Sequence, residues 1–286
     1  MVFKVSFSAD VKEELSKISN FNQEILKLEL FGYILSGNCI EKNGNIEFIT
    51  ENDFNIEHLY KILFNLKIDY EPEIRGKCYV AKFIKNDDIF DIFQNYDILN
   101  EDLNRNIVKG AFLGSGSVNN PDKNYHLEIT FLNERYSNII SSICEKYGVN
   151  FKKIKLNEKT QIYLKESEEI SRFLALIGAN RAVLNLEDVR VMKEMKNKVN
   201  RKVNCETANL NKTIDAAIRQ IEDINIIKKQ GTFENLPKDL KQVAILRLEN
   251  PDLSLKDLGE MLEPKLSKSA INRKFTKIHE ISENLI

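Results

Sequence analysis

Apolar positions in the first two thirds of the chain follow a pattern that recurs after about 80 residues. Residues 30–38 form an apolar run that ends in small residues, and residues 108–116 form a second run of the same kind. Gly32 and Gly110 occupy equivalent places in the two runs. Both runs are typical of a buried helix, and their small residues would let the two helices approach each other closely.

The segments that follow these two runs also correspond to one another. Alternating apolar positions predict strands, and spacings of three and four residues predict helices. The matched segments are strands 46–50 and 127–130, helices 56–66 and 136–147, strands 78–83 and 161–165, and helices 88–96 and 168–177. A further strand is expected in each half, near residues 70–74 and 151–154. The predicted fold class is α+β, with pseudo-twofold symmetry between residues 21–100 and 101–187.

A long helical pattern covers residues 208–228. Its apolar positions are separated alternately by four and three residues: Leu210, Ile214, Ala217, Ile221 and Ile224. A connecting helix that packs on a neighbouring domain explains such a seam, and a dimer seam is the alternative.

Residues 233–286 are predicted to form an all-α domain of three short helices. Ser254 begins a capping box before the second helix, residues 255–262, and Ser267 can cap the third. The inward face of the third helix carries Ile271, Phe275, Ile278 and either Ser282 or Leu285. Two helices joined by a short turn, the second basic on its outer side, are typical of a helix-turn-helix.

The outer side of the third helix carries side chains suited to double-stranded DNA. Arginine can pair with guanine and asparagine with adenine, while lysine and serine contact phosphates. The expected DNA contacts are Ser254, Lys265, Ser267, Lys268, Ser269, Asn272, Arg273, Lys274 and Lys277. An interaction domain with a solvated basic face is the alternative.

The overall charge conceals a local contrast. The 286 residues include 42 Lys and Arg against 43 Asp and Glu, so the net charge of −1 excludes a protein that is basic throughout. Residues 1–100 hold 11 basic and 17 acidic residues, whereas residues 188–235 hold 10 and 7. The basic segment predicts a second DNA contact, with a solvated helix face as the alternative. This second contact comprises Lys198, Arg201, Lys202, Asn209 and Lys212.

Composition gives no indication of a metal, a cofactor or a membrane segment. The four cysteines lie far apart, and none of the three histidines stands at ligand spacing from another. No apolar stretch reaches the roughly 18–20 residues of a membrane helix. The N-terminal segment lacks the pattern of a secretory signal. We therefore expect a cytoplasmic protein that associates with the nucleoid.

The two glycine-containing helices resemble the LAGLIDADG architecture of homing endonucleases. In that architecture an acid near the end of each helix holds the catalytic metal. Alignment on the shared glycine puts those acids at Gly37 and Ser115, neither of which is a carboxylate ligand. The resemblance therefore implies a non-catalytic domain. The alternative is a residual metal-dependent nuclease that uses the nearest carboxylates, Asp122 and Glu128.

Five runs carry a resemblance that covers the whole chain: residues 5–15, 110–129, 164–179, 200–224 and 266–285. They make the chain similar to the WhiA family of bacterial regulators. The resemblance implies a degenerate LAGLIDADG-like domain tethered to a C-terminal helix-turn-helix. It also implies sequence-specific DNA binding linked to sporulation in actinobacteria, and to cell division and chromosome segregation more broadly. Family members commonly have Gly-Val-Asn-His where this chain has Ala-Ile-Asn-Arg at residues 270–273, so Arg273 adds a charge.

Four parts make up the expected domain organisation. They are an N-terminal helix in residues 1–20, the LAGLIDADG-like domain in 21–187, a basic helical linker in 188–232 and the helix-turn-helix in 233–286. A regulatory protein bound to the LAGLIDADG-like domain is a second expected partner besides DNA. A protein-interaction scaffold with incidental DNA contact is the remaining alternative.

Overall fold

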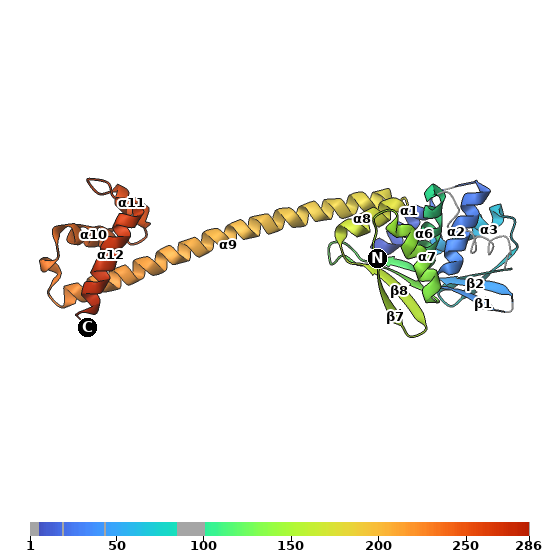
Figure 1. The fold of residues 1–286 in the computed structure, drawn as a ribbon, viewed down its shortest axis with the longest axis horizontal. Helices are drawn as coiled ribbons and strands as arrows, with labels where there is room; N and C mark the ends of the chain where they lie inside the picture. The colour runs from blue at the N-terminus through green and yellow to red at the C-terminus, as the bar shows by residue number, and fades with distance from the viewer. Residues whose placement is uncertain (1–5, 19, 43, 85–100, 286) are drawn as a thin grey trace. The chain divides into compact units, whose positions relative to one another are not determined.

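The chain divides into two compact units. The computed structural model describes residues 6–18, 20–42, 44–84 and 101–285. Unit 1 comprises Met1–Glu194 and unit 2 comprises Met195–Ile286. Unit 1 combines helices with strands, whereas the described residues of unit 2 form helices and no strand (Figure 1). The predicted fold class, an α+β domain followed by an all-α domain, is confirmed.

Unit 1 contains two sets of elements in the same order after α1 (Phe7–Ser16). The first set is α2 (Gln23–Leu35), β1 (Cys39–Lys42), β2 (Asn45–Thr50), α3 (Asp53–Asn65), β3 (Tyr70–Arg75) and β4 (Cys78–Ile84). The second set is α6 (Glu101–Ser115), β5 (Gly116–Val118), β6 (Leu127–Phe131), α7 (Glu134–Glu145), β7 (Lys152–Leu156) and β8 (Lys159–Leu164). The helix α8 (Ser167–Leu176) follows the second set. The predicted repeat is confirmed, whereas the predicted helix at residues 88–96 lies outside the described residues.

Each set folds its strands into a four-stranded antiparallel sheet. The strand orders, β1-β2-β4-β3 and β5-β6-β8-β7, are equivalent. In β6, Leu127, Ile129 and Phe131 are buried, and they alternate with the half-buried Glu128 and Thr130. This period of two puts one face of the sheet on the core and leaves the other face open.

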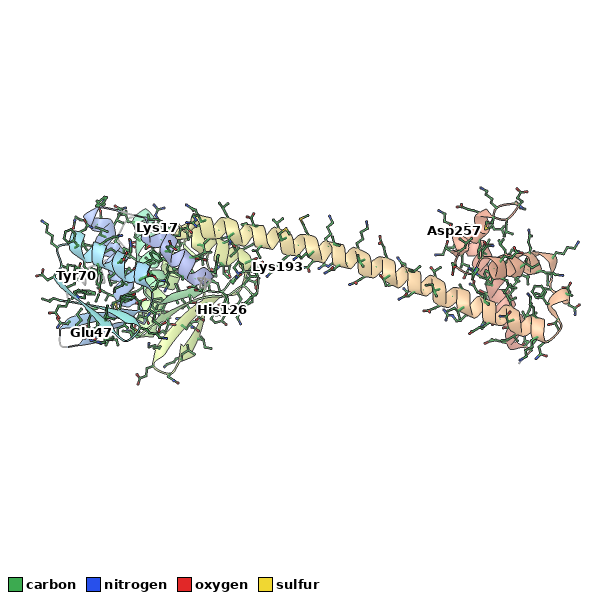
Figure 2. The ribbon with its side chains drawn as sticks, turned by 180° about the vertical axis from the view of Figure 1, so that it is seen from behind. Lys17, Glu47, Tyr70, His126, Lys193 and Asp257 are labelled. Atoms are coloured by element: carbon green, nitrogen blue, oxygen red, sulfur yellow. The ribbon has the colours of Figure 1, made fainter. Side chains whose placement is uncertain are left out.

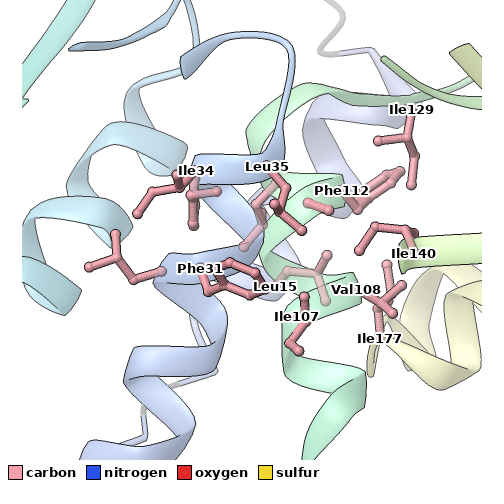
Figure 3. Close-up of a cluster of buried hydrophobic side chains, with 14 of the residues drawn as sticks. Leu15, Phe31, Ile34, Leu35, Ile107, Val108, Phe112, Ile129, Ile140 and Ile177 are labelled. Carbon is pink, nitrogen blue, oxygen red and sulfur yellow. The ribbon is translucent and has the colours of Figure 1, made fainter. Parts of the chain in front are cut away.

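The central contact of unit 1 lies between α2 and α6. A Cβ atom on Gly32 would lie 2.1 Å from the carbonyl oxygen of Ile107, and one on Gly110 would lie 2.0 Å from the carbonyl oxygen of Glu29. Because no side chain fits at such distances, glycine is required at both positions. Buried apolar side chains around this contact include Phe31, Leu35, Val108 and Phe112 (Figure 3). The predicted close approach of the two helices is therefore confirmed.

A buried ion cluster connects α2, α3 and α6 within unit 1. An oxygen of the Glu29 carboxylate lies 2.7 Å from His58 Nε2 and 3.0 Å from Lys109 Nζ. The other ring nitrogen of His58 lies 3.1 Å from the carbonyl oxygen of Ser16. Burial raises the pKa of Glu29, but the hydrogen bond from His58 and the charge of Lys109 outweigh it, so the net pKa is lowered. The buried carboxylate is therefore ionised and paired.

Unit 2 begins within α9 (Asn180–Lys229), a helix of 50 residues. The sequence predicts a helix over residues 208–228 and a linker over 188–232, but one helix continues from Asn180. No glycine or proline interrupts it. The division between the compact units falls inside this helix, between Glu194 and Met195.

The remainder of unit 2 folds around the end of α9. Its elements are a short 3₁₀ turn (Phe233–Asn235), α10 (Lys238–Glu249), α11 (Leu255–Glu260) and α12 (Lys268–Glu283). Ala217 and Ile224 of the predicted seam are buried, whereas Leu210 and Ile214 are 59% and 44% exposed. The seam therefore packs on the small helices only at its C-terminal end.

Candidate nucleic-acid interface

Helix α12 has an apolar side and a polar side, as its sequence predicts. The buried side consists of Ile271, Phe275, Ile278 and Ser282. The hydroxyl oxygen of Ser267 accepts a hydrogen bond from the N–H of Ala270 at 3.3 Å and begins the helix. The predicted cap is thus confirmed. The remaining N–H groups of a first helical turn favour anions such as phosphate.

The turn that precedes α12 is held tightly against α11. A Cβ atom on Gly259 would lie 2.1 Å from the carbonyl oxygen of Leu266, so only glycine allows this approach. Ser254 caps α11: its Oγ accepts from the Asp257 N–H at 3.3 Å and donates to the Asp257 carboxylate at 2.7 Å. The hydroxyl of Ser254, a predicted DNA contact, is therefore already engaged within the protein.

A buried arginine holds α10 against its neighbours. Arg247 is 1% exposed, and burial lowers its pKa. Its Nε donates to Gln220 Oε1 of α9 at 3.0 Å, and its Nη1 donates to the carbonyl oxygen of Leu253 at 2.7 Å. The guanidinium carbon lies 5.6 Å from the ring centre of Phe275 on α12. Because these contacts reach two helices and a turn, Arg247 fixes the position of α12.

Seven predicted DNA contacts lie on residues 268–277 of α12 and on the turn before it. The exposed members are Lys265, Ser267, Lys268, Ser269, Asn272, Arg273 and Lys277. No acid occurs between Lys265 and His279. Over the ranges that the structure describes, none of the four cations in this group forms an ion pair. They are therefore available to an anionic partner.

Lys274 differs from these cations. Its Nζ pairs with the carboxylate of Asp239 on α10, and its side chain is 20% exposed. The hydrogen bond from Lys274 lowers the pKa of Asp239. The Lys274 ammonium group therefore connects α12 to α10.

The second predicted contact lies on α9. Lys198, Arg201, Lys202, Asn209 and Lys212 are all exposed. In Figure 2 the side chains along this part of α9 stand out from the ribbon. The predicted residues are therefore accessible, although they occur far from α12 in the sequence.

A cavity between α9 and α12 includes residues that the sequence did not single out. About 290 Å³ in volume, it is lined by Arg219 of α9 and by Asn272, Thr276 and His279 of α12. Arg219 follows Lys212 at helical spacing, so extending the basic pattern by two turns would have identified it. Thr276 gave no such signal, because its place in the same cavity as Arg219 depends on how the two helices pack.

An acid–base pair joins α9 and α12 next to this cavity. The Nδ1 atom of His279 lies 3.0 Å from a carboxylate oxygen of Asp223, and the hydroxyl of Ser282 donates to the same carboxylate at 2.5 Å. The hydrogen bond to Asp223 and the charge of that carboxylate raise the pKa of His279.

The LAGLIDADG resemblance would place one acid at the end of each glycine-containing helix. In this protein both positions form hydrogen bonds to the backbone of β6 instead. The N–H of Gly37 donates to the carbonyl oxygen of Thr130 at 2.8 Å, and the hydroxyl of Ser115 donates to the same oxygen at 2.5 Å. A Cβ atom on Gly37 would lie 2.9 Å from that oxygen. The position of Gly37 therefore has no room for a carboxylate side chain.

The two alternative carboxylates lie on different parts of unit 1. Asp122 is exposed in a turn, and Glu128 on β6 lies 2.8 Å from His126 Nε2. Apart from the stretches that the structure leaves undescribed, no three His, Cys, Asp or Glu side chains form a group that could hold a metal ion.

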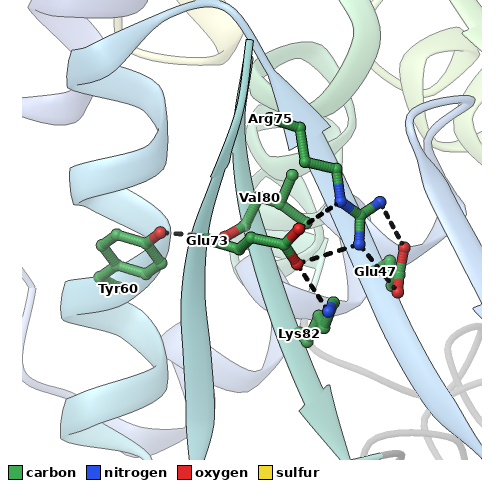
Figure 4. Close-up of polar contacts among 6 residues, drawn as sticks. All are labelled: Glu47, Tyr60, Glu73, Arg75, Val80 and Lys82. Carbon is green, nitrogen blue, oxygen red and sulfur yellow. Dashed lines mark hydrogen bonds and ion pairs between the residues drawn. The ribbon is translucent and has the colours of Figure 1, made fainter. Parts of the chain in front are cut away.

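Charged groups on the open face of the first sheet are paired with one another. Arg75 lies 3.1 Å from an oxygen of Glu47 and 2.7 Å from an oxygen of Glu73, whose other oxygen lies 2.6 Å from Lys82 (Figure 4). The hydrogen bonds from Arg75 and Lys82 lower the pKa of Glu73 to about 2. These cations are neutralised within the protein, unlike Lys268, Arg273 and Lys277 of α12.

Comparisons with known proteins agree with both parts of this architecture. The WhiA LAGLIDADG-like domain matches residues 104–196, and the WhiA C-terminal HTH domain matches residues 199–282. A protein from Clostridium tetani named probable cell division protein WhiA is 41% identical over 274 residues, covering 94% of this chain and 84% of that protein. A protein of the same name from Staphylococcus carnosus is 37% identical over 308 residues, covering 98% of each chain.

Two solved structures have a similar fold. Full-length DUF199/WhiA from Thermotoga maritima superposes with a TM-score of 0.65 and 28% identity, covering 98% of this chain and 99% of that one. The N-terminal LAGLIDADG domain of DUF199/WhiA gives a TM-score of 0.57 at 22% identity, covering 62% and 93% of the two chains. The second likeness concerns the fold alone.

Fold and sequence together define a class of proteins in which a pseudo-symmetric LAGLIDADG-like domain is joined to a C-terminal helix-turn-helix. Within this class, the chain belongs to the WhiA family. Outside the undescribed stretches, none of its helices is long and apolar enough to cross a membrane.

Proposed function

We propose that this protein is a non-catalytic, sequence-specific regulator that reads double-stranded DNA with α12. One observation carries the proposal: the outer side of α12 between Lys268 and Lys277 is exposed and cationic, while contacts of Arg247 and Gly259 fix the helix on its inner side. A rigidly held helix with Asn272 and Arg273 on its outer side suits base recognition in the major groove. DNA contacts would come from Lys265, Ser267, Lys268, Ser269, Asn272, Arg273 and Lys277.

The biological role that we propose is control of cell division. Support comes from the curated relatives, which are named probable cell division proteins. The family resemblance extends the proposal to chromosome segregation and, in organisms that sporulate, to sporulation. A regulator of this kind would be associated with the nucleoid in the cytoplasm.

Genome-wide crosslinking of the full-length protein, followed by binding to the recovered sites, tests this function. We expect discrete sites that share a sequence, and strong retardation of those sites by the parent protein. An Arg273→Ala, Lys277→Ala double variant should lose that retardation, whereas a Lys196→Ala, Lys229→Ala variant should keep it. A uniform distribution of crosslinks along the chromosome would contradict the proposal, and so would full binding by the Arg273→Ala, Lys277→Ala variant.

The alternative function is a metal-dependent nuclease that uses Asp122 and Glu128. We favour a non-catalytic protein because Gly37 and Ser115 stand at the helix ends. Incubation of the protein and a recovered DNA site with magnesium or manganese separates the two. Intact DNA is the expected result, whereas site-specific cleavage that disappears in Asp122→Asn, Glu128→Gln would support the nuclease.

We also propose that unit 1 binds a regulatory protein. The open face of its first sheet has paired charges and carries Ile40 and Ile84, which are 49% and 63% exposed. Such a neutral, partly apolar face suits a protein better than a polyanion. A photo-crosslinking residue at Ile40 should capture one defined protein in cells, whereas the same residue at Lys61 on α3 should not. Equal capture at both positions would contradict this proposal.

A further inference from the structure

One side of α9 carries cations at a regular helical spacing. Successive members of this side are separated alternately by four and three residues: Lys198, Lys202, Cys205, Asn209, Lys212, Ala216 and Arg219. With 3.6 residues per turn these positions lie on one face of the helix, and Arg201 borders it. We call this surface, from Lys198 to Arg219, the basic face of α9.

The basic face contains no acid. Glu206 and Asp215, the acids within the same stretch, lie about 80° and about 100° away from Lys198 around the helix axis. Lys198, Lys202 and Lys212 are exposed, and within the described part of the chain none of them forms an ion pair. Cations that are gathered on one face without acids repel one another, so an anionic partner would stabilise this arrangement.

The C-terminal end of the basic face meets the polar side of α12. Arg219 lines the 290 Å³ cavity together with Asn272 and Thr276. Asn272 belongs to the group that is proposed to read bases. The basic face and the reading side of α12 therefore open onto the same surface of unit 2.

We infer that the basic face of α9 binds the phosphate backbone of the same DNA duplex that α12 reads. The inference rests on the proposed function and adds a second helix, and Arg219, to the interface. From Lys198 to Arg219 the helix extends about 32 Å. This length is close to one turn of B-DNA, about 34–36 Å. The basic face thus matches the backbone along roughly one helical turn.

The two helices have different tasks in this arrangement. Lysine and arginine side chains on phosphates add affinity for any sequence and position the protein on the duplex, whereas base contacts select the site. Removing cations from α9 should therefore weaken binding equally for all sequences. Removing them from α12 should also reduce discrimination between sequences.

A salt titration of binding to a duplex of arbitrary sequence, about 40 base pairs long, tests the inference. Fluorescence anisotropy of the full-length protein gives the slope of log K, where K is the association constant for the duplex, against log salt concentration. The slope is negative, and its magnitude falls by about 0.9 for each phosphate contact that is lost, so Lys202→Gln, Lys212→Gln should reduce the magnitude by about 1.8. The matched control, Lys196→Gln, Lys229→Gln, changes the net charge equally on other sides of α9 and should keep the parent slope.

An α12 variant, Lys268→Gln, Arg273→Gln, separates failure of this inference from failure of the proposed function. A slope of smaller magnitude in both the α9 and α12 variants supports this inference and the proposed function. If only the α12 variant changes, the basic face of α9 does not bind DNA and the inference is overturned, while the proposed function stands. If only the α9 variant changes, α12 is not the reader and the proposed function falls. Equal loss in the α9 variant and its control would also overturn the inference, because net charge alone would then explain it.

Discussion

The two compact units use their charged side chains in opposite ways. In unit 1, Glu29 is buried against His58 and Lys109, and Arg75 on the open sheet is held between two glutamates. In unit 2, the cations of the basic face of α9, together with Lys268, Arg273 and Lys277 of α12, are exposed, and none of them forms an ion pair within the described residues. Paired charges stabilise or position elements of the fold, whereas exposed unpaired cations attract an anionic ligand. Within unit 2 the same distinction separates Arg247 and Lys274, which hold helices together, from Arg273.

The largest expected effect concerns the buried cluster of unit 1. Glu29→Leu leaves Lys109 and His58 without their carboxylate, so unit 1 should lose about 3–5 kcal/mol of its free energy of unfolding. The matched substitution Glu47→Leu removes a partly exposed carboxylate and should cost about 1 kcal/mol or less. Urea denaturation of the full chain measures both. Equal losses would show that burial does not distinguish these pairs.

The lowered pKa of Glu29 predicts the sign of the pH dependence of this cluster. Because the pKa of Glu29 is lower in the folded protein, its stabilising contribution is present above its ordinary value of 4.5 and is lost as the pH falls through the lowered value. The difference in unfolding free energy between the parent and Glu29→Leu should therefore shrink on acidification below pH 4.5. A difference that grew instead would contradict the lowered pKa.

The next effect concerns DNA recognition by α12. If Arg273 contacts a base, Arg273→Gln should cost about 1–3 kcal/mol at one position of the site and relax the preference there. Lys277→Gln should weaken binding about equally for all sequences. Lys274→Gln is the control, because its ammonium group is paired with Asp239. Binding to a panel of single-base variants of the recovered site measures all three. Similar losses at Lys274 and Arg273 would remove the distinction between paired and unpaired cations in unit 2.

A smaller effect is expected on the open face of the first sheet. Arg75→Gln removes the link between Glu47 and Glu73, but these groups are partly exposed, so the loss of stability should be much smaller than that of Glu29→Leu. The pKa of Glu73 should rise from about 2 towards the ordinary value. NMR titration of the carboxyl carbon follows it directly. An unchanged pKa would mean that Lys82 alone holds Glu73 in its ionised form.

The smallest effect concerns the pair between α9 and α12. The pKa of His279 should lie above its ordinary value of 6.5 and fall in Asp223→Asn. Because the folded-state pKa is raised, the contribution of this pair is present below pH 6.5 and is lost as the pH rises through the raised value. NMR titration of the imidazole protons measures the shift, with His126 as the internal comparison. A pKa that does not respond to Asp223→Asn would show that this contact does not form in solution.

Much of the candidate nucleic-acid interface could be predicted from the sequence, because the signals that predict it are local. Caps at Ser254 and Ser267 depend on a hydroxyl and an N–H three residues apart, and the apolar side of α12 follows helical spacing. The ion pairs and contacts that could not be predicted join residues that are distant in the chain. Lys274 and Asp239 are 35 residues apart, so only the packing of α10 against α12 pairs them.

By itself, the sequence determined the repeated domain and the two glycines of its central contact. Periodicity and residue size act within single helices and strands, so they can be read along the chain. Tertiary structure alone decided which charges are neutralised and which remain exposed. It placed Arg219 and Asn272 in one cavity, buried Arg247 and paired Lys274, because an ion pair or a shared cavity depends on distances in space.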